Sequence, residues 1–251
     1  MKITGIVITK NEELNIKGCL ESIKWLDEII IVDTNSEDKT LDHAKNYTEK
    51  IYSTQIENIP EKRKFSLSQT EISNSWILFL DADERITPEL KDEMESLEEN
   101  TGIDGYYINR RNYYFGKWIK HCGIYPDYCL RLFRKDKGRV SDRIIHEGIE
   151  VDGKCEMLKN DMLHYSYRDL EQMVNKINFF SSAEAEENFL KNKKITKTGV
   201  FLHFLSAFLR VFISRKGYKD KLHGFYVSFS YAMVNFLSHL KLLKLQNKLS
   251  A

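Results

Sequence analysis

Three acidic side chains stand together directly after a short apolar segment. Asp81, Asp83 and Glu84 follow residues 76–80, whose sequence WILFL is typical of a buried strand. Carboxylates this close repel one another, and a divalent cation that bridges them to a diphosphate would relieve the repulsion. Carboxylate and phosphate oxygens are ligands that Mg²⁺ and Mn²⁺ prefer. The pair formed by Asp81 and Asp83 therefore indicates a metal and diphosphate site, with a solvated turn that caps a helix as the alternative.

Two further positions could contact the same kind of ligand. Asp33 ends the apolar segment 28–33, where its carboxylate could accept hydrogen bonds from a ribose or a base. An Asx-type turn into the next helix explains this residue equally well. Arg63 and Lys64 could contact a diphosphate, although on local sequence alone a solvated helix face fits them better.

Another group of residues could move a proton. The pair His146-Glu147 follows two isoleucines, and His164 lies in the segment LHYSYR. Transfer to a hydroxyl needs a general base, which is usually a carboxylate or a histidine. Partial burial could raise the pKa of Glu147 toward a value useful for a base. Asp127 and Asp142 are the competing carboxylates, and an interior structural role is the alternative for each histidine.

The elements that must position these residues alternate along the chain. The strand patterns are residues 3–9, 28–33, 50–53 and 76–80. Helical patterns lie between them, which predicts βαβ units, a mostly parallel sheet and helices on both faces. Ligands of such sheets bind beyond the carboxyl ends of the strands. Thr9, Glu12, Asp33 and the two aspartates at 81 and 83 all follow strand ends, so the polar candidates cluster where the fold predicts a site.

The pattern changes after Gly102. Residues 106–115 and 129–134 indicate strands of a more mixed region, and the chain has helical spacing from Asp169 onward. We therefore predict an α/β domain over residues 1–168 and a basic helical extension over residues 169–251. The apolar face of the first helix in the extension is predicted to carry Leu170, Met173, Val174, Ile177 and Phe180.

Absent motifs and the spacing of the cysteines argue against several functions. No GxGxxG follows the first strand and no GxxxxGK[ST] occurs, which argues against a dehydrogenase or a P-loop kinase. The 4 cysteines have no CxxC spacing, so we expect reduced cytoplasmic thiols. The apolar run at the N-terminus is too short for a signal peptide, and secretion is not expected. Nucleic acid is not expected as a partner.

Charge is divided unevenly along the chain. From Lys191 onward there are 12 Lys and Arg residues and one acid, Asp220, whereas acidic residues outnumber basic ones before it. The apolar segments 199–213 and 225–237 are shorter than the roughly 20 residues that span a bilayer. Basic residues flank both segments, which favours helices lying on the anionic inner face of the cytoplasmic membrane. A helical subdomain that only packs on the first domain is the alternative.

Four segments together resemble family 2 glycosyltransferases, particularly the bacterial lipopolysaccharide core branch that includes β-1,4-glucosyltransferases. They are VITKNEELNIKGCLESIKWLDEIIIVDTNSEDKT, WILFLDADERITPEL, GYYINRRNYYFGKWIKHCGIYPDYCLRLFRKDKGRVSDRIIHEGIEVDG and LHYSYRDLEQM. The first two are shared across the superfamily. The run from FGKWIKHCGIYPDYCLRLFR to HE is more specific to the branch.

The resemblance implies a GT-A fold, a divalent cation (Mg²⁺ or Mn²⁺) and inversion at the anomeric carbon. The implied reaction moves a sugar from a nucleotide sugar, with UDP-glucose as the preferred donor, to a hydroxyl of a glycan or glycolipid. The resemblance assigns Thr9, Glu12, Arg63 and Asp81 to the nucleotide sugar, Asp33 to its nucleoside, Asp83 and His164 to the metal, and Glu147 to the catalytic base. The family's Gly-aromatic-Gly and Gln-Lys-Asn stretch is replaced by residues 60–64 (PEKRK), so Arg63 is assigned by position alone.

Three other functions are alternatives to this one. A sugar nucleotidyltransferase would need a Gly-rich, Arg-containing loop after the first strand, where this chain has residues 9–13 (TKNEE). A non-catalytic carbohydrate-binding protein could keep the fold, although both aspartates and the His-Glu pair are present. A transferase could also act on a protein acceptor.

Overall fold

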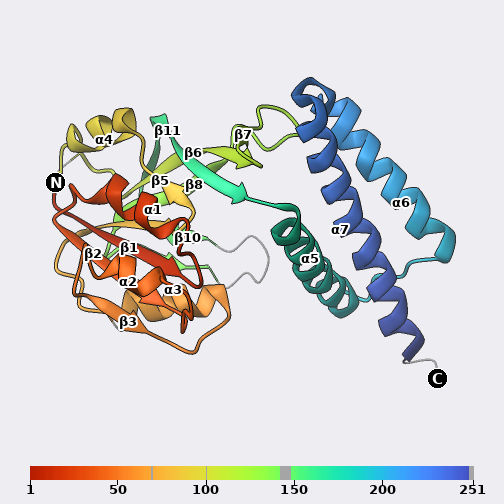
Figure 1. Cartoon of the computed structure of the whole chain (residues 1–251), viewed down its shortest axis with the longest axis horizontal. Helices are drawn as coiled ribbons and strands as arrows, with labels where there is room; N and C mark the ends of the chain where they lie inside the picture. Colours follow the sequence, from red (N-terminus) through yellow and green to blue (C-terminus); the bar gives the residue numbers. More distant parts are fainter. Residues whose placement is uncertain (69, 100, 142–147, 249–251) are drawn as a thin grey trace. The chain divides into compact units, whose positions relative to one another are not determined.

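The computed structural model describes residues 1–68, 70–99, 101–141 and 148–248, which form two compact units (Figure 1). The first unit comprises Met1–Arg111 and Asp127–His164, and the second comprises Asn112–Pro126 and Tyr165–Ala251. The chain therefore passes between the units along the strands β6 (Gly105–Tyr114) and β11 (Cys155–Tyr167).

Parallel strands form one side of the main sheet. Their order is β3-β2-β1-β4, and all three pairings are parallel, as predicted. The strands are β1 (Ile3–Thr9), β2 (Glu28–Asp33), β3 (Ile51–Ser53) and β4 (Trp76–Asp81). The helices between and after them are α1 (Ile16–Ile23), α2 (Thr40–Ala44), α3 (Ile59–Ser68) and α4 (Pro88–Glu95).

The sheet continues with strands of mixed direction. Beyond β4 the order is β8-β6-β11-β5, with β8 antiparallel to β4 and β6, and β5 antiparallel to β11. The added strands are β5 (Glu84–Arg85) and β8 (Tyr128–Arg134), with β7 (Lys117–Trp118) paired to β6. A separate two-stranded sheet joins β9 (Gly138–Val140) and β10 (Ile149–Val151).

The parallel strands β1, β2 and β4 are buried on both faces, which explains their continuous apolar sequences. In β4, Trp76, Leu78 and Leu80 pack with residues of α1 and α4. The alternate residues Ile77 and Phe79 pack into a second core with α3. Since side chains alternate across a strand, one short apolar run supplies both cores.

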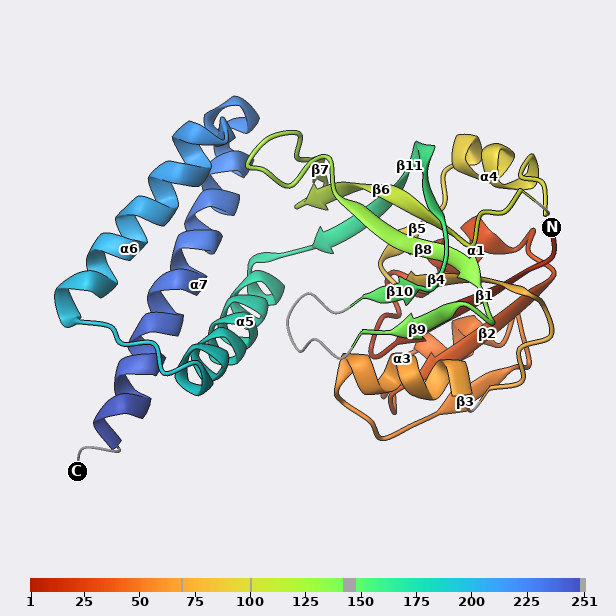
Figure 2. The ribbon, with the colours of Figure 1, turned by 180° about the vertical axis from the view of Figure 1, so that it is seen from behind.

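Three long segments build the helical part of the second unit. They are α5 (Leu170–Leu190), α6 (Lys197–Leu209) and α7 (Lys221–Lys248), and the chain between α6 and α7 contains a π-helical turn (Arg210–Ser214) and a 3-10 turn (Gly217–Asp220). Helix α7 lies between α5 and α6 and packs against both (Figure 2). No helix within the described ranges has the length and apolar character needed to cross a membrane.

The buried face of α5 differs in part from the prediction. Met173 and Ile177 are buried, but Leu170, Val174 and Phe180 are exposed. The buried row continues through Ser181, Ala185 and Asn188. These residues recur at intervals of three or four, and the small side chains at 181 and 185 allow α7 to approach closely.

The loop before β8 belongs to the second unit. It contacts Asp220, which is the single acid of the basic tail. Ile119 and Cys122 share a small core with Val211 and Val227. Asp220 is buried, and its Oδ2 accepts a hydrogen bond of 2.8 Å from the backbone N–H of His121. Part of the branch-specific sequence run therefore serves to attach this loop to the helices.

Candidate functional site

The polar residues at the ends of β1, β2 and β4 lie in adjacent register positions of the sheet. Thr9 pairs with Asp33 across β1 and β2, and Ile8 pairs with Asp81 across β1 and β4. Because these strands are parallel, their carboxyl ends meet at one edge of the sheet. The register thus brings together three residues assigned from sequence, and parallel sheets of this kind bind ligands at that edge.

Hydrogen bonds join the loops that follow β1 and β2. The backbone N–H of Glu12 donates to Thr40 Oγ1 over 2.8 Å, and the Asn15 side chain donates to Glu12 Oε2 over 2.8 Å. Asp33 is fully buried, and its Oδ2 accepts from the backbone N–H of Ser36 over 2.9 Å. Asp33 therefore orders the turn at the rim of the candidate site through a local hydrogen bond, which reaches three residues on and not the two of an Asx turn.

Six ionised side chains of alternating sign form a continuous row through the first unit, which we call the charge row. Its members are Asp127, Arg110, Glu84, Arg131, Asp81 and Arg63. The successive nitrogen–oxygen distances are 2.8, 3.4, 2.6, 2.7 and 3.3 Å. Three carboxylates and three guanidiniums balance one another, which makes the burial of so many charges tolerable.

Asp81 keeps its negative charge within the charge row. Burial opposes ionisation, but the nearby Arg131 and Arg63 guanidiniums outweigh that effect and hold the pKa of Asp81 well below its usual range. The Asp81 side chain remains 32% exposed, whereas Glu84 is fully buried. Asp81 is thus an accessible carboxylate, and Glu84 is an interior partner of the arginines.

Asp83 faces a histidine from a distant part of the chain. Antiparallel pairing aligns His164 of β11 with Glu84 of β5, and this leaves His164 Nε2 3.5 Å from Asp83 Oδ2. The family resemblance assigned both residues to a metal, and the fold brings them together. Within the ranges that the structure describes, no group of three or more His, Cys, Asp or Glu side chains gathers as a complete metal cage.

Arg63 differs from its local prediction. A solvated helix face fitted its sequence best, but the residue is only 6% exposed and its guanidinium contacts Asp81. The reason is that α3 turns this side toward the sheet, where the Arg63 guanidinium also lies 5.7 Å from the Phe79 ring centroid. Glu147, the assigned base, and Asp142, its competitor, lie outside the described residues.

Sequence reasoning missed two arginines of the charge row, Arg131 and Arg110. Arg131 interrupts the apolar strand segment LRLF of β8 and is only 4% exposed. A charged residue within an apolar strand requires a buried partner, so this signal was available. Its partners Asp81 and Glu84 are distant in sequence, and only the sheet order shows that they meet.

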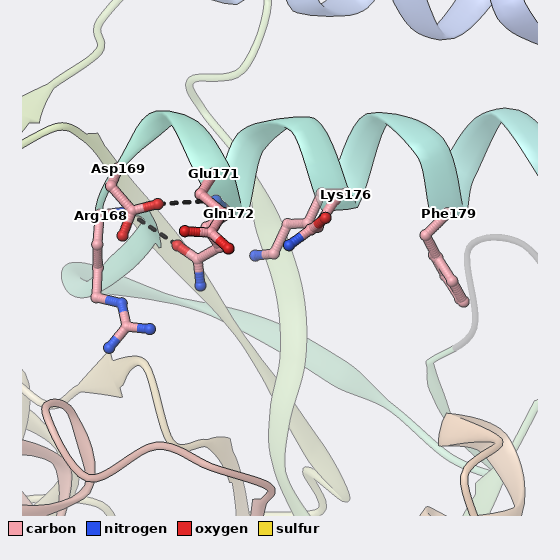
Figure 3. A pocket seen from close by; sticks show the side chains of 7 residues that line it. Arg168, Asp169, Glu171, Gln172, Lys176 and Phe179 are labelled. Carbon is pink, nitrogen blue, oxygen red and sulfur yellow. Dashed lines mark hydrogen bonds between the residues drawn. The ribbon is translucent and has the colours of Figure 1, made fainter.

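A separate recess lies along the first half of α5 in the second unit (Figure 3). Its volume is about 460 Å³. Polar side chains dominate it, and the Asp169 cap that accepts from the Gln172 backbone N–H at 2.8 Å fixes one end. Its lining residues are Arg168, Asp169, Glu171, Gln172, Asn175, Lys176 and Phe179.

The sequence profile of glycosyl transferase family 2 matches residues 4–149, which include β1 to β4 and Asp81-x-Asp83. The chain belongs to this family. The predicted α/β GT-A fold with C-terminal helices is confirmed by this membership together with the observed sheet. The prediction of a family 2 glycosyltransferase is likewise confirmed at that level.

Individual relatives agree with the family assignment. An uncharacterized glycosyltransferase of Rickettsia typhi is 31% identical over 261 residues, which cover 98% of this chain and 88% of the relative. The lipopolysaccharide core biosynthesis glycosyltransferase LpsC of Rhizobium meliloti is 26% identical over 250 residues, or 96% of this chain and 92% of LpsC. Among solved structures, S. aureus TarS 1–349 with UDP-GlcNAc aligns over 100% of this chain and 92% of its own, with 14% identity and a TM-score of 0.48.

Proposed function

We propose that this family 2 transferase moves a sugar, with glucose as the preferred one, from a UDP-sugar to a hydroxyl of a lipopolysaccharide core or related cell-surface glycan. The observation that carries the proposal is the position of Asp81 and Asp83 at the end of β4, with buried arginines next to Asp81 and His164 next to Asp83. The name of the LpsC relative supports the class of acceptor.

The nucleotide would occupy the edge formed by the ends of β1 and β2. Thr9, Glu12 and Asp33 are its proposed contacts, with Asp33 acting through the turn that it orders. The Thr9 hydroxyl is buried and has no hydrogen-bond partner among the residues whose placement is described. A buried polar group without a partner is costly, and a bound nucleotide could supply one.

The diphosphate would lie beside Asp81 and Arg63. Arg63 Nε is buried and, in the described part of the chain, has no hydrogen-bond partner. A guanidinium that uses one edge for a carboxylate and keeps a donor for an anion suits phosphate oxygens. Arg63 would then bind the donor, while Asp81 orients the guanidinium.

The residues present fit a divalent cation. Asp83 offers a carboxylate and His164 an imidazole at 3.5 Å from it, and Mg²⁺ or Mn²⁺ is commonly held by one or two protein ligands together with phosphate oxygens. When bound, the cation would supply positive charge to the departing diphosphate. We propose Asp83 as its direct ligand and His164 as the second one.

A single displacement would complete the transfer. The acceptor oxygen forms a bond to the anomeric carbon as the bond to the diphosphate breaks, and Glu147 takes the hydroxyl proton. Attack from the face opposite the diphosphate inverts the configuration. We further propose a cytoplasmic enzyme held peripherally on the inner face of the membrane, which the excess of basic residues after Lys191 supports.

A donor screen tests this proposal. The purified chain is incubated with individual nucleotide sugars, a core oligosaccharide and Mn²⁺ or Mg²⁺, and released nucleoside diphosphate is measured. We expect release from UDP-glucose above other donors, loss with a chelator and loss in Asp83→Ala. The matched control is Asp92→Ala, which removes an exposed acid of α4 and should keep full activity. Full activity of folded Asp83→Ala in excess chelator would refute the metal site.

A further inference from the structure

Helix α6 exposes a wide apolar surface. Its side chains Phe201, Leu202, Leu205 and Leu209, with Ile213 of the following turn, are between 41% and 65% exposed. At about 100° per residue, the four helical positions fall within an arc of roughly 100°. We call these five residues the apolar face. An exposed apolar face of this kind is unusual on the surface of a soluble protein and indicates a site that contacts another protein or a membrane.

The apolar face is not the side by which α6 packs in its own unit. Val200 and Ala207 are almost fully buried, and they lie on the opposite side of the helix from Leu202 and Leu205. Phe204 belongs to the packing side as well, and its ring lies 5.8 Å from that of Phe236 in α7. Helix α6 therefore has two apolar sides, one packed against α7 and the other exposed, and the exposed polar residues His203 and Ser206 lie between them.

Aromatic rings extend this surface onto α7. Phe208 of α6 lies 5.7 Å from Phe225, and Phe225 stacks with Phe229 at 6.1 Å. Phe225, Phe229 and the neighbouring Leu222 are each more than one-third exposed. The exposed apolar side chains thus belong to two helices that pack together, and they are not isolated from one another.

Positive charge accompanies the apolar face. The exposed basic residues of the connection between α6 and α7 are Arg210, Arg215, Lys216, Lys219 and Lys221. The one acid of this segment, Asp220, is buried against His121. A second copy that met this face with its own would bring the same positive charge to the contact, whereas anionic lipid headgroups would complement it.

We propose that the apolar face lies in the interface of an anionic membrane, with the basic connection on the headgroups. No described helix is suited to span a bilayer, so α6 would lie along the surface with its leucines and phenylalanine among the upper acyl chains. The inference rests on the peripheral location proposed above and names its contact surface. It does not depend on the transfer chemistry, because vesicle binding is measured without donor or acceptor.

Vesicle sedimentation with the full chain tests this inference. We expect binding to phosphatidylcholine vesicles that contain phosphatidylglycerol, weak binding to phosphatidylcholine alone, and loss of binding in high salt. Leu202→Gln/Leu205→Gln and Lys216→Glu/Lys219→Glu should each lower the partition coefficient by about tenfold or more. The matched controls Leu170→Gln/Val174→Gln, on exposed positions of α5, and Lys2→Glu/Lys17→Glu should leave it unchanged.

A second measurement locates the face in the bilayer. Phe201→Trp should gain fluorescence quenching by brominated lipids relative to wild type, while Val174→Trp should not. Equal binding to neutral and anionic vesicles, no binding, or equal losses in the control variants would overturn the proposal. So would a wild-type dimer in analytical ultracentrifugation that Leu202→Gln/Leu205→Gln abolishes, since the face would then join two copies.

Discussion

At the scale of single residues, the charge row explains how the candidate site tolerates several buried ionised groups. Arg131 is its central member, because it contacts Asp81 at 2.7 Å and Glu84 at 2.6 Å. Removing one partner from a buried ion pair leaves an uncompensated charge in a poorly hydrated place. Arg131 therefore holds both the position and the charge of the accessible carboxylate Asp81.

Arg131→Met should destabilise the protein strongly. We expect the free energy of unfolding to fall by about 3–5 kcal/mol, because Asp81 and Glu84 lose a shared buried partner. Urea unfolding followed by circular dichroism measures the change. Arg139→Met is the control, since Arg139 pairs with Glu150 at 3.0 Å on the surface. That change should cost less than about 1 kcal/mol, and equal losses in the two variants would contradict a structural role for the charge row.

The assignment of the base makes a separate prediction at Glu147. Glu147→Gln keeps the shape of the side chain and removes its basicity, so turnover should fall by about 100-fold or more while donor binding stays nearly intact. Asp127 is already engaged by Arg110 in an ion pair of 2.8 Å. Steady-state rates and UDP titrations of Glu147→Gln, Asp127→Asn and Asp142→Asn separate these roles. Normal turnover in Glu147→Gln, with a folded but inactive aspartate variant, would move the base to that aspartate.

At the scale of elements, Glu28 connects three segments at the start of β2. Its carboxylate accepts hydrogen bonds from Thr4 of β1, from Lys50 beside β3 and from Ser73 before β4. Burial opposes ionisation, but these partners outweigh it and lower the pKa of Glu28 from 4.5 to about 2. One ionised side chain thus stabilises the amino ends of neighbouring parallel strands.

Acid should remove this stabilisation. Because the pKa of Glu28 is lower in the folded state, its contribution is complete above pH 4.5 and is lost as pH falls toward about 2. Glu28→Gln should therefore cost about 1–3 kcal/mol at neutral pH, and the difference from wild type should shrink through that acid window. Urea unfolding at successive pH values measures it. The surface variant Glu61→Gln should show little change, and a Glu28→Gln difference that is constant with pH would be inconsistent with this account.

The start of α7 depends on a glycine. A Cβ built on Gly224 would lie 1.8 Å from the backbone oxygen of Gly217, so the helix and the preceding 3-10 turn approach too closely for any side chain. Gly224→Ala should cost about 1–3 kcal/mol through overpacking, measured as a lower unfolding temperature. Gly148→Ala is the control, since its added Cβ meets nothing within 4 Å among the residues that the structure describes. Wild-type stability of Gly224→Ala would show that the turn relaxes freely.

Elements buried on both faces were the most predictable. Strands β1 and β2 have the predicted bounds, because continuous apolar runs leave little choice of structure. Helical spacing in the sequence predicts a helix over residues 11–23, but α1 begins only at Ile16, because tertiary contacts compete for the residues before it. The Asn11 side chain accepts from the Glu37 backbone N–H at 2.9 Å, which ties this stretch to the next loop. Such a contact has no signature in local sequence.

At the scale of the whole molecule, the sequence has an acidic first part and a basic tail. The strand ends carry Thr9, Asp33 and Asp81 in adjacent register, as the βαβ pattern required. Arg131 and Arg110 were not predicted, since their partners meet them only through the order of β4, β8 and β6. The exposed side of α6 was also not predictable, because a helix with apolar residues on two sides does not indicate which side a neighbour will cover.

Product analysis tests most directly whether this chain transfers a sugar. Labelled UDP-glucose, Mn²⁺ and a lipopolysaccharide core oligosaccharide are incubated with the full chain, and the oligosaccharide is analysed by mass spectrometry. We predict the gain of one labelled hexose with wild type, and no gain with folded Asp83→Ala. No transfer from any nucleotide sugar by a folded chain that still binds the oligosaccharide would contradict the claim and indicate a carbohydrate-binding protein.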